Sequence, residues 1–134
     1  MTMTEELILR APDDDYMSVE QIAFFRDRLL SLRETLVARR DSERVDTRER
    51  HADEADMATA EESYWLNVQL REREARQIVD IDEALKRIRN GDYGWCEDTG
   101  EAIGIKRLLV NPSTRYSADA MERRERRART MVAA

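Results

Sequence analysis

The sequence predicts a mainly α-helical protein, built as a long antiparallel two-helix coiled coil with a small globular region and a C-terminal helix. Charged residues make up 39% of the 134 residues, with four glycines and two prolines, a composition typical of long charged helices. Apolar residues recur at helical spacing in two stretches that a polar segment separates. The expected division is an N-terminal segment packed on the globular region (1–17), the hairpin (18–90), and the globular region with its C-terminal helix (91–134).

The first long helix is expected to start after Ser18, because its side chain can accept a hydrogen bond from the N–H of Gln21 while Gln21 reaches back. The apolar residues that follow have the alternating spacing of a coiled-coil seam: Ile22, Phe25, Leu29, Leu32 and Leu36. The second stretch has helical spacing too: Ala60, Tyr64, Val68, Ala75, Ile78, Leu85 and Ile88. It ends at Asn90-Gly91, which predicts a left-handed C-cap. Two helices of about thirty residues give a hairpin roughly 45 Å long.

The tip of the hairpin is expected at about residues 51–58. Two of its aspartates, Asp53 and Asp56, allow two interpretations. Either could simply cap the second helix, since Asp is among the best N-cap residues, or they could be functional carboxylates. Apolar residues become fewer toward this turn, so we expect a packed base and a looser tip.

The segment 91–112 resembles a four-cysteine zinc finger in which only one of the four ligands, Cys96, is present. Cys96 is followed at the second ligand position by Thr99, and a second pair would fall at Ser117 and Ala120. A structural zinc site needs four thiolate or imidazole ligands. We therefore expect a degenerate, zinc-finger-like region that holds no metal, and no other cofactor is indicated.

Apolar packing should replace the metal in this region. A short helix is expected over 105–110, ended by Pro112. Cys96 is interpreted as a small packed residue, with redox sensing as the alternative. The residues expected to form the apolar cluster are Trp95, Ile103, Ile105, Leu108, Leu109 and Val110.

Charge and composition limit the function. A net charge of −6 and a pI near 5.0 argue against general nucleic-acid binding, and no sequence-specific DNA binding is expected. From Arg115 to Arg129, six arginines face three acidic residues, either as a solvated helix face or as a docking patch for an acidic protein surface. No catalytic motif and no long apolar segment is found, so we expect a cytoplasmic protein that is neither an enzyme nor membrane-bound.

The frame from Tyr93 through Cys96, Gly100, Ile103 and Leu108 to Pro112 resembles the C-terminal globular region of the DksA/TraR family of bacterial transcription factors. The resemblance covers residues 16 to about 130 and is nearest to the cysteine-poor form of alphaproteobacteria. It implies a regulator that binds RNA polymerase and inserts its coiled-coil tip into the secondary channel to modulate initiation.

The resemblance also implies roles for particular residues. Asp53, Asp56 and Ala58 match the family's tip motif, Asp-x-x-Asp-x-Ala. Arg73 matches a polymerase-contacting arginine. From the sequence alone, Arg73 could equally form an ordinary helix salt bridge with neighbours such as Glu72.

Three positions depart from the family pattern. Family members that bind the alarmone ppGpp use basic residues where this chain has Asp80, Asn111 and Met121. An aspartate or an asparagine cannot replace these cations toward a polyphosphate, so a ppGpp response is doubtful. Compensation by nearby arginines keeps the question open; the candidates are Arg76, Arg107 and Arg115.

A generic coiled-coil adaptor or structural interaction protein is the alternative function. The seam fades before the tip, whereas a dimerising zipper should stay apolar along its length. We therefore expect a monomer.

Overall fold

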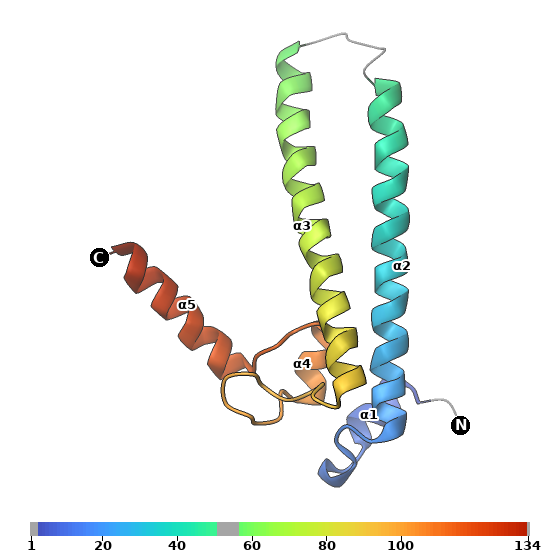
Figure 1. Cartoon of the computed structure of the whole chain (residues 1–134), viewed down its shortest axis with the longest axis vertical. Coiled ribbons are helices and arrows are strands. Elements are labelled where there is room, and N and C mark those ends of the chain that lie inside the picture. The colour runs from blue at the N-terminus through green and yellow to red at the C-terminus, as the bar shows by residue number, and fades with distance from the viewer. Residues whose placement is uncertain (1–2, 51–56, 134) are drawn as a thin grey trace.

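The structure, a computed structural model, describes residues 3–50 and 57–133, and the side chains within 3–43 and 59–131. Figure 1 shows two long helices side by side, as an antiparallel hairpin that rises from a small base. The predicted fold class is confirmed. In chain order the elements are α1 (Glu5–Arg10), a 3-10 turn (Asp13–Asp15), α2 (Val19–Arg50), α3 (Met57–Asn90), α4 (Ile105–Val110) and α5 (Ala118–Ala133).

Both ends of the hairpin base are capped as the sequence indicates. Ser18 Oγ accepts from the N–H of Gln21 at 3.3 Å, and Gln21 Oε1 accepts from the N–H of Met17 at 2.9 Å. The Gln21 side chain accepts from Met17 rather than from Ser18, because the N–H of Ser18 already donates to the carbonyl of Asp15 at 2.9 Å. At the far end of α3, Gly91 has a φ of +83°. The N–H groups of residues 91 and 92 close the helix on the carbonyls of residues 88 and 87, which is a Schellman motif.

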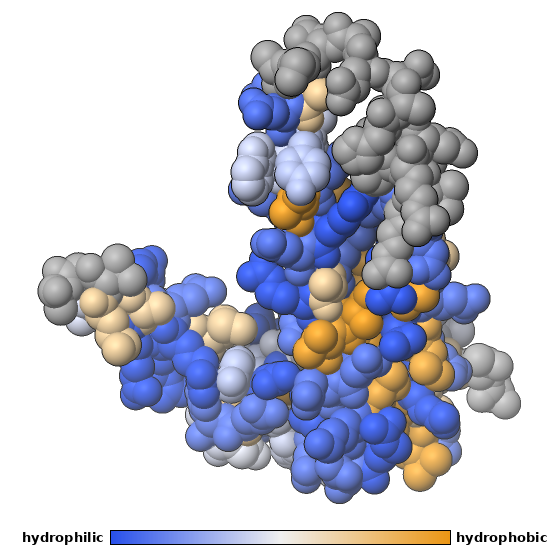
Figure 2. Space-filling view, turned by 45° about the horizontal axis from the view of Figure 1, so that its top comes forward, coloured by the Kyte–Doolittle hydropathy of each residue, from blue (hydrophilic) through white to orange (hydrophobic). Residues whose placement is uncertain are grey.

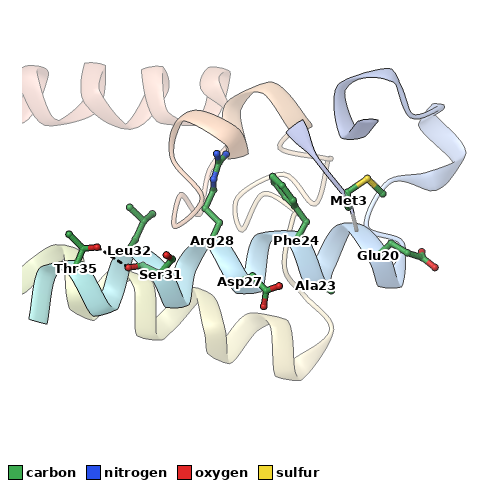
Figure 3. Close-up of a pocket in the computed structure, with 9 residues that line it drawn as sticks. All are labelled: Met3, Glu20, Ala23, Phe24, Asp27, Arg28, Ser31, Leu32 and Thr35. Atoms are coloured by element: carbon green, nitrogen blue, oxygen red, sulfur yellow. Dashed lines mark hydrogen bonds between the residues drawn. The ribbon is translucent and has the colours of Figure 1, made fainter. Parts of the chain in front are cut away.

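The hairpin seam differs in part from the predicted one. Phe25, Leu29 and Leu36 are buried as expected, but Leu32 is 42% exposed. The seam passes instead through Arg33, whose Nε donates to Asp82 of α3 at 2.7 Å. Leu32 lies one residue away, on the outer side of α2. There it lines a groove of about 620 Å³ (Figure 3).

The α3 side of the seam needs larger corrections. Ile78 is buried, with Ile81 and Ala84 beside it in the core, while Val68, Leu85 and Ile88 are half-buried. Ala60, Tyr64 and Ala75 are exposed, so their predicted seam positions are wrong. Glu74, which is 4% exposed, takes the place expected of Ala75. Among the described side chains, the fully buried apolar residues of the seam therefore lie in the lower arm, and Arg39 and Glu74 follow above them.

The N-terminal segment packs against the base. Ile8 of α1 is buried in the same cluster as Leu108 of α4. Tyr16 donates its hydroxyl to the carbonyl of Gly94 at 2.5 Å and accepts from the N–H of Gly104 at 3.0 Å. Gly94 has a φ of +93°, and a Cβ there would lie 2.5 Å from Met17 Sδ. Position 94 therefore requires glycine.

The expected short helix over 105–110 is present as α4. Its C-cap Asn111 donates its N–H to the carbonyl of Arg107, and Pro112 follows. Helix α5 leaves the base and points away from it (Figure 1), and most of its residues are exposed. Among the described residues, no helix is long and apolar enough to span a membrane.

Candidate functional site: the arm and the degenerate finger

The tip residues can be placed only in part. Asp53 and Asp56 lie outside the described residues. Ala58 lies in the first turn of α3, in a part of the helix whose side chains are not described. Both interpretations of Asp53 and Asp56, as helix caps and as functional carboxylates, therefore stand as predictions.

Arg73 lies on the exposed side of α3. The intrahelical salt bridge considered above is not formed, because none of the ion pairs among the described residues includes Arg73. Its neighbour Glu74 faces the other helix instead and pairs with Arg39 at 3.3 Å. The guanidinium of Arg73 is therefore available to a partner, while Glu74 is used inside the arm.

A charged layer crosses the arm at the level where the apolar seam ends. Glu74 Oε1 accepts from Arg39 of α2, and its second oxygen, Oε2, is buried without a hydrogen-bond partner. Slightly higher, Arg71 donates to the carbonyl of Glu43 at 3.3 Å, and its Nε lies 3.8 Å from Glu43 Oε2. Burying charge costs free energy even when it is paired. This layer is thus held less firmly than the apolar base, in line with the looser arm expected toward the tip. The sequence pattern did not indicate the ion pairs themselves.

The four former ligand positions come together in the finger. Cys96 and Ala120 are buried, at 3% and 1% exposure. The Cys96 thiol lies within hydrogen-bond reach of the Thr99 hydroxyl and of the N–H groups of residues 98, 99 and 117. Burial alone would raise the pKa of this thiol. The hydrogen bonds outweigh burial and lower the pKa to about 6.

These residues do not fit zinc. A hydroxyl at Thr99, a hydroxyl at Ser117 and a methyl group at Ala120 cannot replace three thiolates. Ser117 Oγ is moreover used as the cap of α5, where it accepts from the N–H of Ala120 at 3.2 Å. No group of three or more His, Cys, Asp or Glu that could hold a metal occurs in the described part of the chain.

Direct contacts join the two halves of the finger instead. The N–H of Glu97 donates to the carbonyl of Arg115 at 2.9 Å. Asp98 accepts two hydrogen bonds from Arg124 of α5, each 2.6 Å long. The same guanidinium lies 4.0 Å from the centre of the Tyr116 ring, within cation–π range.

The three positions that depart from the ppGpp pattern lie near the surface, with Asp80 and Asn111 exposed and Met121 half-buried. Of the candidate compensating arginines, Arg107 is engaged internally. Its Nε donates to the carbonyl of Tyr116 at 2.8 Å.

Comparisons with known proteins agree with this architecture. The model of the DnaK suppressor protein DksA N-terminal domain matches residues 21–88, and that of the prokaryotic dksA/traR C4-type zinc finger matches residues 91–126. The RNA polymerase-binding transcription factor DksA of Caulobacter vibrioides is 40% identical over 121 residues, 87% of this chain and 84% of that protein. The Escherichia coli K12 protein of the same name is 33% identical over 124 residues, 90% of this chain and 82% of that one.

A solved structure extends the match to three dimensions. The transcription factor DksA2 from Pseudomonas aeruginosa superposes with a TM-score of 0.83 at 45% identity, covering 93% of this chain and 98% of that one. A two-helix arm on a finger-like base with one cysteine at the four ligand positions defines the class as a cysteine-poor, zinc-finger-like protein with a helical arm. The chain belongs to the DksA/TraR family.

Proposed function

We propose that this protein binds RNA polymerase and reaches into the secondary channel with its helical arm to modulate transcription initiation. The observation that carries the proposal is the shape of the arm. The arm consists of two helices side by side (Figure 1). They have 32 and 34 residues, so each is about 50 Å long. Such an arm is thin enough for a narrow channel, and its relatives are named as RNA polymerase-binding factors.

In this proposal, the tip produces the effect on transcription and the rest of the arm provides contacts with RNA polymerase. Asp53, Asp56 and Ala58 would act near the catalytic centre, and the unpaired Arg73 would contact polymerase. The role is regulatory rather than catalytic, and it is exercised in the cytoplasm. ppGpp would have little additional effect, because Arg107 is engaged with Tyr116 and Asp80 adds negative charge.

The adaptor alternative is not favoured. A self-associating zipper needs a continuous apolar seam, whereas the upper seam here is charged around Glu74 and Arg39. The proposed role is also the one that its relatives' names describe.

The direct test is to mix the purified protein with RNA polymerase and pass the mixture over a sizing column. A second experiment measures competition with a known secondary-channel factor. Co-elution that the competitor abolishes supports the proposal. Absence of co-elution, or co-elution that the competitor leaves unchanged, contradicts it.

A further inference from the structure

Two aromatic residues are exposed together on the upper arm. Tyr64 and Trp65 of α3 are 53% and 63% exposed, and their rings meet edge to face with centroids 5.7 Å apart. Figure 2 shows pale and orange side chains among blue ones over the upper part of α3. Trp and Tyr are enriched in protein interfaces and among the residues that dominate binding energy. An exposed pair on a thin arm therefore indicates a contact surface.

The charged residues of α3 nearest to this pair are negative. Glu61 and Glu62 precede Trp65 by four and three residues, and Glu72 follows it by seven, so these three carboxylates lie on the Trp65 side of α3. All three are exposed, and none takes part in an ion pair among the described residues. Between residues 59 and 70 the sequence has no lysine or arginine. Within this stretch of α3, Glu61 and Glu62 therefore have no neighbouring cation.

We propose that the Tyr64–Trp65 face, with Glu61, Glu62 and Glu72, binds a cationic segment of RNA polymerase. A guanidinium or ammonium group would stack on the indole of Trp65, where cation–π attraction is strongest among aromatic residues, while the carboxylates pair with neighbouring cations. An acidic or purely apolar partner would leave the carboxylates desolvated without compensation. This inference rests on the proposed function and assigns affinity to the arm, separate from the action of the tip.

The test compares two exposed residues on the same turn. Trp65→Ala removes the aromatic face. Leu66→Ala, at a residue that is 62% exposed and about 100° further around the helix, is the matched control. Affinity for purified RNA polymerase is measured by titration of fluorescently labelled protein. We expect Trp65→Ala to raise the Kd about tenfold or more, as truncation of an interface tryptophan does, and Leu66→Ala to change it less than about threefold. Circular dichroism and melting should match the parent for both, since neither residue is buried.

A charge variant tests the nature of the partner. Glu61→Gln with Glu62→Gln should weaken binding and make the Kd less dependent on salt, because fewer ion pairs are then screened. The inference is overturned, with the proposed function intact, if wild-type protein binds and Trp65→Ala binds equally well. It is also overturned if Leu66→Ala loses as much affinity, or if the glutamine variant binds more tightly. If the wild-type protein does not bind polymerase, both proposals fail. Self-association that Trp65→Ala abolishes would assign the face to a second copy and overturn the inference as well.

Discussion

Asp98 and Arg124 join the first turn of the finger to α5 through two parallel hydrogen bonds of 2.6 Å. Arg124 also covers the Tyr116 ring, so one guanidinium connects three segments of the base. In a four-cysteine finger, the metal would join the turn at residues 96–99 to the start of the C-terminal helix. The ion pair makes a connection between the same two segments without a metal.

Loss of this pair should loosen α5 rather than unfold the hairpin. We expect Asp98→Ala to lower the melting temperature modestly and to speed hydrogen exchange in α5, with exchange in the lower parts of α2 and α3 unchanged. The Arg124 guanidinium holds the pKa of the Asp98 carboxyl below its ordinary value of 3.8. The contribution of the pair is therefore present above about pH 4 and is lost as the pH falls further.

The matched control is Glu122→Ala. Glu122 pairs with Arg126 within α5 and not with the base, so its loss should leave the attachment of α5 unchanged. Equal exchange rates in the Asp98 and Glu122 variants would show that the ion pair does not attach α5.

The former ligand positions should accept zinc again when their thiols are restored. Thr99→Cys, Ser117→Cys and Ala120→Cys together supply four thiolates around the site where Cys96 already lies. We expect this triple variant to bind one zinc per chain and to melt lower in the presence of a chelator, because metal binding is coupled to folding. Elemental analysis and thermal melts check both points.

The unaltered protein is the comparison. It should carry no stoichiometric zinc, and a chelator should leave its melting temperature unchanged. One equivalent of zinc in the unaltered protein would overturn this prediction, and so would a triple variant that folds but binds none.

Cys96 should make stability depend on pH. The thiol has an ordinary pKa of 9.0, and its hydrogen bonds in the folded chain lower this pKa to about 6. Between these values the unfolded chain binds more protons than the folded one, so stability rises with pH across this window. The contribution is fully present above about pH 9 and is lost as the pH falls through about 6. Unfolding in urea at several pH values, compared with Cys96→Ser, measures it.

The same thiol should react slowly despite its charge. Cys96 is only 3% exposed, and alkylation needs access as well as a thiolate. Absorbance of the thiolate should titrate with a midpoint near 6 in the folded protein. A difference in unfolding free energy between the parent and Cys96→Ser that stays flat from pH 6 to 9 would contradict the lowered pKa.

Much of this fold could be predicted from local signals. The start of α2 at Ser18 and the end of α3 at Gly91 depend on residues within one turn, so their patterns are visible in the sequence. The seam was harder, because a helical spacing that includes Leu32 or Ala75 looks as regular as one through Arg33 or Glu74. Long-range ion pairs decide between the two.

The candidate site was predictable only where the chain is locally distinctive. Cys96 and Thr99 mark the degenerate finger by their spacing. The partnership of Asp98 with Arg124 spans 26 residues and leaves no local signal. Exposure of Trp65 was likewise invisible, since an aromatic residue in a helix is as readily buried as exposed.

Glu74 should limit the stability of the arm. Its buried carboxylate has one partner at 3.3 Å, and its second oxygen has none. Only the carboxylate of this pair is buried, because the Arg39 side chain is 53% exposed and stays hydrated when Glu74 is replaced. Glu74→Leu removes the buried charge and extends the apolar seam upward, so it should raise the free energy of unfolding by about 1 kcal/mol.

Arg39→Ala should act in the opposite direction, because it leaves the carboxylate buried without a partner. We expect a loss of about 1–3 kcal/mol, below the full cost of breaking a buried pair because Arg39 itself is half exposed. Denaturant unfolding of both variants provides the measurement. A destabilised Glu74→Leu protein would show that the charged layer holds the arm together.

The last prediction separates the action of the tip from its structure. If Asp53 and Asp56 act on polymerase, Asp→Asn at either position should leave the fold intact, since asparagine caps a helix about as well as aspartate. The effect on transcription should fall, while affinity for polymerase changes little, because the arm provides the contact area. This pattern is the reverse of that expected for Trp65→Ala, so the two variants together assign effect and affinity to different parts of the hairpin. Transcription from a responsive promoter, binding titration and thermal melts give the three readouts. If either Asn variant instead lost about 1 kcal/mol or more of stability with its transcriptional effect unchanged, the residue would be a helix cap and not a functional carboxylate.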